Sequence, residues 1–145
     1  MPSIRKYEIK FMNNYLKPNM DGDLHSMSVL GLAYVGDAVF ELMIRTWLST
    51  SHGTSTAKNL HIETVSYVSA KAQAVSAEKI VPLLNEEEYA VFKRGRNAHV
   101  NNVPRGSTYE EYHNATGIEA LFGYLYLRGE TARLNELFEM ILEEK

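Results

Sequence analysis

The sequence predicts an all-α protein built as one domain. Apolar residues recur at helical spacing along most of the 145 residues, cap residues separate these stretches, and no alternating pattern of useful length indicates a strand. Hydrophobic residues make up 45% of the chain, which is enough for a single core, so a second folded module is not expected.

Composition also narrows the class of protein. The chain has no cysteine and no N-terminal stretch with the charged start and apolar centre of a signal peptide, so we expect a cytoplasmic protein without disulfides. The longest apolar stretches, residues 29–48 and 115–127, are interrupted by charged side chains, and neither predicts a membrane span.

An N-terminal arm and a series of helical segments follow from the spacing and the caps. In chain order they are residues 1–23 for the arm or a short helix, then Ser26–Thr50, Thr54–Leu84, Asn85–His99, Thr108–Arg128 and Thr131–Glu144. Ser26 or Ser28 is the expected N-cap of the first long helix. The acids that follow Asn85 favour a helix start there, those at 110 and 111 favour one at Ser107 or Thr108, and Gly129 is a typical helix stop.

The segment Thr54–Leu84 is the least regular of these. Its apolar side chains fall on one helical face, namely Leu60, Val65, Val68, Ala72 and Val75. We expect a break into two helices near Ser76 and an end at Pro82. Residues 99–107, with their proline, glycine and asparagines, predict a loop before the next helix.

The net charge of −3 is unevenly distributed. Residues 89–107 hold the bases Lys93, Arg94, Arg96 and Arg105, together with His99, and no acid, whereas residues 108–145 hold eight acids and three bases. A locally basic segment permits a polyanion to dock on one face, although an ordinary solvated loop would have the same composition.

Two acids stand out because each lies in the apolar middle of a helix. Asp37 has apolar neighbours on both sides in sequence, and Glu119 is the only charged residue in the stretch 115–126. A carboxylate in apolar surroundings needs a partner, and oxygen donors from two facing helices suit magnesium. The alternative for Asp37 is a polar seam with Glu41 and Arg45, which follow at helical spacing.

Small residues on both helices favour a close approach of these acids. They are Gly31, Ala33, Gly36 and Ala38 on the first helix and Ala115, Gly117, Ala120 and Gly123 on the second. Glycine inside a helix costs about 1 kcal/mol relative to alanine, so these glycines indicate tight packing. We therefore expect Asp37 to lie near Glu119.

The residues around both acids resemble a known family. Gly31–Glu41 (GLAYVGDAVFE) resembles the signature helix of the ribonuclease III family, and Ala115–Leu127 (ATGIEALFGYLYL) resembles its second catalytic helix, in the same order. Tyr67–Ala74 and Arg94–Ala98 resemble segments of the Mini-III branch, which consists of the nuclease domain alone. The resemblance covers residues 24–130, and two motifs in register make it specific.

The resemblance implies a helical, ribonuclease III-like endonuclease domain over residues 24–145, with no separate double-stranded-RNA-binding domain. It implies that Asp37 and Glu119 are catalytic and hold Mg²⁺, or Mn²⁺ in its place, which activates a water for attack on an RNA phosphate and leaves 5′-phosphate ends. Carboxylate-held magnesium suits this hydrolysis, because it supplies a hydroxide at neutral pH and a cation beside the developing charge.

The chain departs from larger members of that family at two positions. Leu30 stands where they place an early glutamate, and Thr116 stands where they place the aspartate three residues before Glu119. The Mini-III branch is similar in this respect, so the two remaining acids would carry nearly all direct metal coordination. A contribution from Glu41 through water stays an alternative to its favoured pairing with Arg45.

The resemblance further implies a symmetric homodimer that accepts an RNA duplex, with precursor 23S ribosomal RNA as substrate and ribosomal proteins as candidate partners. Duplex RNA is recognised mainly through shape, phosphates and 2′-hydroxyls. The donors expected on that backbone are Lys71, Gln73, Arg94, Arg96, Asn97 and Arg105. Two alternatives stay open: a catalytically idle RNA-binding or ribosome-assembly module with the same fold, and a helical interaction protein that does not contact RNA.

Overall fold

The computed structural model of the chain describes residues 14–20, 24–53, 55–98, 103 and 105–143. Within these ranges the chain forms helices joined by short turns, and no strand occurs. The elements are η1 (Leu24–Ser26), α2 (Val29–Ser51), α3 (Ala57–Val68), α4 (Ala70–Ile80), η2 (Val81–Leu83), α5 (Glu86–Arg96), α6 (Tyr109–Leu127) and α7 (Thr131–Leu142). The predicted all-α class is confirmed.

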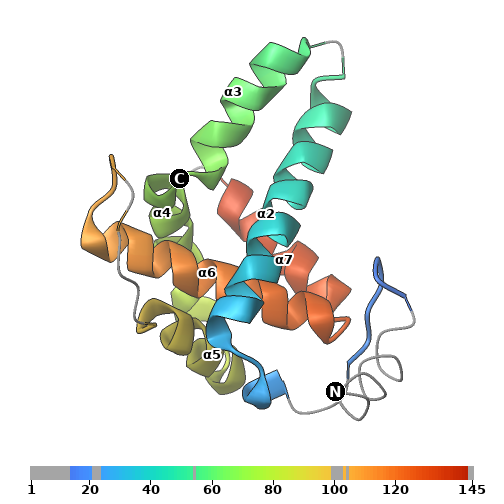
Figure 1. Cartoon of the computed structure of the whole chain (residues 1–145). Helices are drawn as coiled ribbons and strands as arrows, with labels where there is room; N and C mark the ends of the chain where they lie inside the picture. Colours follow the sequence, from blue (N-terminus) through green and yellow to red (C-terminus); the bar gives the residue numbers. More distant parts are fainter. Residues whose placement is uncertain (1–13, 21–23, 54, 99–102, 104, 144–145) are drawn as a thin grey trace, which may run out of the picture.

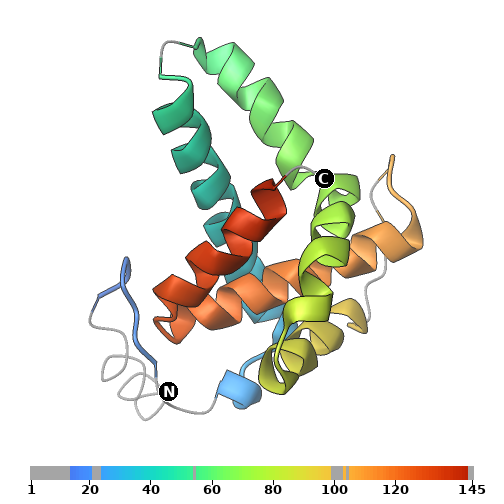
Figure 2. The ribbon, with the colours of Figure 1, turned by 180° about the vertical axis from the view of Figure 1, so that it is seen from behind.

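Helix α6 lies at the centre of the molecule (Figure 1). Helices α2, α5 and α4 make its most extensive contacts, and the reversed view in Figure 2 shows α4 and α7 on the opposite side from α2. Buried residues run along α6 from Ala115 to Leu127 on all of its faces, which is typical of a helix surrounded by others. This central position makes α6 a rigid support for any side chain that it carries.

Side-chain caps confirm most of the predicted helix starts. Ser28 is the N-cap of α2, and its hydroxyl accepts a backbone hydrogen bond from the first turn. Asn85 forms a reciprocal capping box with Glu88 at the start of α5, and Thr108 forms one with Glu111 at the start of α6. These side chains satisfy amides that a first turn leaves unpaired, so the helices begin where local chemistry favours it.

The break in the segment Thr54–Leu84 lies at Ser69, so the prediction of a break near Ser76 is wrong. Ser69 ends α3 and caps α4 with its hydroxyl, which accepts a hydrogen bond from the Ala72 amide at 3.2 Å. Ser76 lies inside α4, where its hydroxyl donates to the Ala72 carbonyl. Serine is compatible with either role, and apolar spacing alone does not distinguish them.

The apolar face predicted for this segment is not one buried face. Val65 and Val75 are 47% and 50% exposed, and Thr64 is the only fully buried residue within the described helix α3. Helix α4 turns a more polar side, including Gln73, toward the core. Because the chain changes direction at Ser69, residues before and after it do not share a face.

Glycines bring α2 and α6 into backbone contact. A Cβ added to Gly36 would lie 1.6 Å from the carbonyl oxygen of Glu119, and one added to Gly123 would lie 2.0 Å from that of Leu32. No side chain fits at either position without separating the helices. The predicted close approach is confirmed here, and it sets Asp37, the residue after Gly36, beside Glu119.

The other two glycines of the predicted small-residue set have different surroundings. A Cβ on Gly117 would meet the ring of Phe92 at 2.7 Å, so Gly117 admits α5 rather than α2. A Cβ on Gly31 would meet nothing nearer than 3.7 Å. Gly31 therefore does not belong to the helix crossing.

Helix α2 extends beyond the body of the fold and pairs there with α3 (Figure 1). The rings of Trp47 and Tyr67 meet edge to face at 5.2 Å, and His52 Nδ1 lies 3.2 Å from the Glu63 carboxylate near the tip. The far half of α2 therefore has few neighbours besides α3 in its own chain.

Two predicted segments lie largely outside the described residues, the arm at 1–23 and the loop at 99–107. In the described part of the arm, residues 14–20 are not helical, and the Met20 amide donates to the Leu127 carbonyl at 2.8 Å. None of the described helices is both long enough and apolar enough to cross a membrane.

Candidate active site

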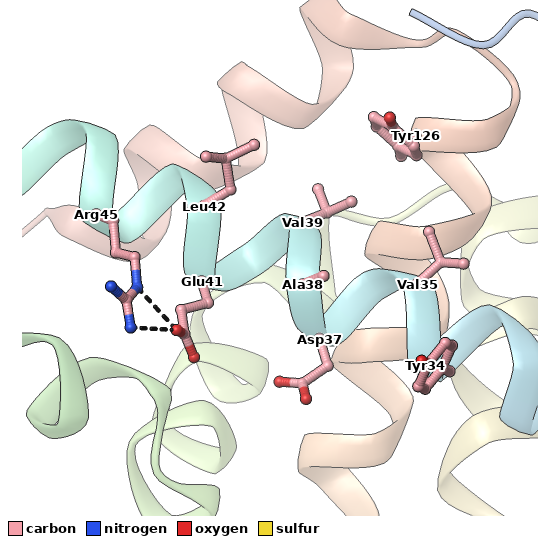
Figure 3. Close-up of a pocket in the computed structure, with 9 residues that line it drawn as sticks. All are labelled: Tyr34, Val35, Asp37, Ala38, Val39, Glu41, Leu42, Arg45 and Tyr126. Atoms are coloured by element: carbon pink, nitrogen blue, oxygen red, sulfur yellow. Dashed lines mark hydrogen bonds and ion pairs between the residues drawn. The ribbon is translucent and has the colours of Figure 1, made fainter. Parts of the chain in front are cut away.

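Asp37 and Glu119 lie side by side where α2 crosses α6. The Gly36 contact sets the two backbones against each other, and the two carboxyl groups come within hydrogen-bonding reach. Glu119 is partly buried, whereas Asp37 is exposed on the side of α2 that it shares with Glu41 (Figure 3). We expected both carboxylates to be buried among apolar side chains. This prediction is partly confirmed for Glu119, and it is wrong for Asp37 in the single chain.

The surroundings of Glu119 favour its protonated form. Burial raises the pKa of Glu119 to about 8, and Asp37 adds to the rise through its charge and a hydrogen bond. The amide of Gln73 lowers the pKa and is the smallest of these influences. Two carboxyl groups this close cannot both ionise at low cost, so the pair favours either a shared proton or a cation.

Glu119 borders a pocket of about 410 Å³ between α4, α6 and the turn before α6. Its polar and charged lining consists of Ser69, Lys71, Gln73, Arg105, Ser107, Tyr112 and Glu119. The N-cap and first turn of α4 are part of that lining, so the positive end of the α4 dipole lies at the pocket. Two bases and a helix N-terminus beside Glu119 suit an anion such as a phosphate. The contribution of the α4 terminus was not predicted, because it depends on the break at Ser69.

Asp37 borders a second and larger hollow of about 670 Å³ along the outer face of α2 (Figure 3). Apart from Asp37, Glu41 and Arg45, its lining is apolar or aromatic. Tyr34 and Leu42, which line it, are 84% and 58% exposed. The carboxylate pair thus lies between a basic pocket and an apolar surface.

Three of the predicted RNA-contacting residues share the pocket of Glu119. Lys71 and Arg105 are exposed there, as a contact with a phosphate backbone requires. Gln73 lines the same pocket but is only 1% exposed. The expectation that Gln73 meets an RNA backbone therefore conflicts with its burial.

The other predicted donors lie elsewhere. Arg96 and Asn97 line a separate hollow of about 530 Å³ with His113. Arg94 is half-buried, its Nη2 donates to the Met27 carbonyl at 3.5 Å, and its Nη1 is buried with no hydrogen-bond partner among the described residues. The structure does not bring Arg94 to either site, so its expected place on an RNA backbone is not supported.

Comparison with known proteins decides the family. Residues 30–130, most of the chain, match the family model described as the ribonuclease III domain. The chain belongs to the ribonuclease III family. This family membership confirms the resemblance seen around Asp37 and Glu119, and it makes the chain an endoribonuclease.

Individual ribonuclease III relatives agree. The chain is 44% identical over 140 residues to a Mini-ribonuclease 3 of Thermoanaerobacter sp. (strain X514), and the matched region covers 97% of each chain. It is 42% identical over 120 residues to a Mini-ribonuclease 3 of Clostridium tetani, covering 83% of this chain and 80% of that one. The crystal structure of a protein from Fusobacterium nucleatum matches with a TM-score of 0.76 at 30% identity, over 84% of this chain and 97% of that chain.

The two positions where the chain lacks the acids of larger ribonuclease III enzymes offer no substitute ligand. Leu30 is apolar, and the hydroxyl of the buried Thr116 donates to the Tyr112 carbonyl within α6. Among the described residues, no cluster of three or more histidine, aspartate or glutamate side chains could hold a metal ion. A cation at this site would therefore depend on Asp37 and Glu119.

Glu41 makes a different contact. Its carboxylate pairs with Arg45 one turn later, at 2.7 Å from Nη2 and 2.8 Å from Nε (Figure 3). The favoured interpretation of Glu41 as an intrahelical partner of Arg45 is confirmed.

Proposed function

We propose that this endoribonuclease cleaves double-stranded RNA with Mg²⁺ held by Asp37 and Glu119. The observation that carries the proposal is the pair itself, two carboxyl groups from crossing helices within hydrogen-bonding reach. Like charges at this separation favour a cation between them.

The donor set fits magnesium. Protein-bound Mg²⁺ commonly has one or two carboxylate ligands and completes its shell with water and substrate phosphates, so two acids are sufficient. Mn²⁺ prefers the same hard oxygen ligands and is expected to substitute. When bound, the ion would supply an activated water and stabilise charge on the phosphate under attack. The chain's own contribution is to hold both carboxylates on helices whose glycine contact limits their separation.

The pocket of Glu119 is the expected seat of the RNA backbone. Lys71 and Arg105 are exposed cations in that pocket, and the α4 N-terminus adds backbone amides and a favourable dipole. These groups contact phosphate and carry no base-specific information, which agrees with recognition of a duplex by its shape. Because these contacts neutralise phosphates and release counterions from the RNA, duplex affinity should fall as the salt concentration rises.

We infer a homodimer that forms through the outer face of α2. Leu30, Tyr34, Ala38 and Leu42 recur every four residues along this face, and all four are exposed. An exposed apolar stripe beside a hollow is typical of a protein interface. A partner on this face would lie next to Asp37, so the two carboxylate pairs of a dimer could serve the two strands of one duplex.

Asp37→Asn is the decisive test. Cleavage of a long RNA duplex with Mg²⁺ should fall by at least about 1,000-fold. Duplex affinity should be retained or rise, because one negative charge is removed. Glu78→Gln is the matched control, since Glu78 is an exposed acid of α4 that lines neither hollow beside Asp37 and Glu119. Undiminished cleavage by the Asp37→Asn protein would show that the assignment is wrong.

The finer substrate that we propose is precursor 23S ribosomal RNA in the cytoplasm, with ribosomal proteins as candidate partners. Its support is the resemblance of the chain to the Mini-III branch. Cells that lack the protein should accumulate 23S precursors with unprocessed ends, measured by primer extension. The competing function is an idle ribosome-assembly module, which would bind duplex RNA at low salt and cleave it at no Mg²⁺ or Mn²⁺ concentration.

A further inference from the structure

Gln73 is buried to an unusual degree for a polar side chain. It is 1% exposed, and among the described residues it is the only polar member of the largest fully buried side chains. Burying an amide without a partner costs free energy, so such a side chain normally has a hydrogen bond. Gln73 Nε2 is buried and has no hydrogen-bond partner among the described residues.

The neighbour of this amide is the candidate active site. Gln73 and Glu119 line the same pocket, and Gln73 belongs to the first turns of α4, whose N-cap Ser69 fixes where that helix begins. A carboxylate can only accept hydrogen bonds, so the side of the amide that suits it is the N–H side.

We propose that Gln73 is a positioning residue: its unpartnered Nε2–H is the donor for the Glu119 carboxylate when that carboxylate and Asp37 hold one shared cation, and the bond orients Glu119 toward it. The inference deepens the proposed function and rests on it. It also replaces the earlier expectation that Gln73 contacts an RNA backbone, because a fully buried amide is not accessible to a phosphate. Partners of this kind commonly change metal affinity or activity 10- to 100-fold when they are lost.

The test uses Gln73→Met, which keeps most of the side-chain volume and removes the donor. In the full chain without RNA, calorimetry with Mn²⁺ should show affinity reduced about 10-fold. With duplex RNA, kcat should fall by a similar factor while KM stays near the wild-type value, because the RNA contacts are retained. The Mg²⁺ concentration that gives half-maximal cleavage should rise.

Two further variants separate positioning from stability. Gln73→Asn keeps an amide on a shorter side chain and should recover part of the lost Mn²⁺ affinity, and it replaces Gln73→Met in the comparison if that protein does not fold. Ser76→Ala removes another buried polar group from α4 that does not line the pocket. It should leave Mn²⁺ affinity, kcat and KM unchanged.

Several outcomes would overturn the inference. Wild-type Mn²⁺ affinity and kcat in both Gln73 variants would show that the amide does not orient Glu119. A raised KM with unchanged Mn²⁺ affinity would indicate an RNA contact instead, and a lowered melting temperature with normal affinity would indicate a purely structural amide. Failure of the proposed function is recognised separately, since the wild-type protein itself would then neither bind Mn²⁺ nor cleave the duplex.

Discussion

The two hollows beside the carboxylate pair differ in chemistry and in the helices that build them. The pocket at Glu119 is lined by the α4 N-terminus and by Lys71 and Arg105, whereas the hollow at Asp37 follows the apolar outer face of α2. Glu119 projects from the central helix and is partly buried, while Asp37 projects from a helix with one face uncovered.

Because of this difference, the two sides of one site suit two different binding partners. The basic pocket can attract a polyanion, and the apolar face can bind another protein surface. The basic pocket and the apolar face meet at the crossing of α2 and α6. Asp37 and Glu119 come together there because Gly36 and Gly123 let the two backbones touch.

Gly36→Ala should have the largest effect, because the added Cβ would lie 1.6 Å from a backbone oxygen that cannot move aside alone. We expect a loss of about 4 kcal/mol or more in the free energy of unfolding, together with loss of cleavage. Urea denaturation measures it. Gly31→Ala on the same helix is the control and should gain about 0.5–1 kcal/mol, since its nearest neighbours are 3.7 Å away. Equal stability of the two variants would contradict the backbone contact.

Leu42→Lys should disrupt the apolar outer face of α2 and leave the basic pocket of Glu119 unchanged. A charge within the apolar stripe of the proposed interface should weaken the dimer at least about 30-fold, so that light scattering at micromolar concentration shows a monomer. Leu83→Lys replaces a side chain of similar exposure, 50% against 58%, on η2 and should stay dimeric. A wild-type protein that is already monomeric would exclude the dimer.

Glu119→Gln should stabilise the metal-free protein as pH rises. The pKa of Glu119 is raised from 4.5 to about 8 in the folded chain, so the folded state binds more protons than the unfolded state between these values. Wild-type stability therefore falls as pH rises through that window, whereas a glutamine has no such dependence. Thermal melts in EDTA should show a gain of about 5 °C at pH 8.5 and almost none at pH 4.5. A gain independent of pH would contradict the burial of this carboxylate.

Lys71→Met should have the smallest effect, which is confined to duplex binding at the basic pocket of Glu119. Removing one phosphate contact should weaken duplex binding about 3- to 10-fold and reduce the salt slope by about one. Arg94→Met serves as the comparison, because Arg94 faces the Met27 carbonyl rather than the pocket. The salt slope of the Arg94→Met protein should equal that of the wild type. A salt slope reduced as in Lys71→Met would show that Arg94 does contact the RNA.

Much of the fold was predictable because its signals are local. The caps at Ser28, Asn85 and Thr108 act within one helical turn, and each is present in the structure. The break at Ser69 was missed because the same serine chemistry occurs inside helices, as Ser76 shows. Only the change of chain direction at Ser69 distinguishes the two.

The site was predictable in its acids and less so in its surroundings. Asp37 and Glu119 were recognised from apolar context and motif, and small residues indicated that they meet. The exposure of Arg94 and Gln73 was judged from residue type, and here the structure differs. Arg94 is half-buried beside Met27, which precedes α2, and Gln73 is enclosed in the pocket of Glu119. Residue type states what a side chain can donate but not which neighbour covers it.

By itself, the sequence determined the helical class, the caps, the family and the identity of the two acids, because these depend on local spacing and on motifs. Only the tertiary structure decided that Asp37 is open, that Glu119 is desolvated beside it, and that the α4 N-terminus and Gln73 border the same pocket. Those properties arise from the packing of helices far apart in the chain, where burial and the neighbouring charge set the pKa and the accessibility of each group.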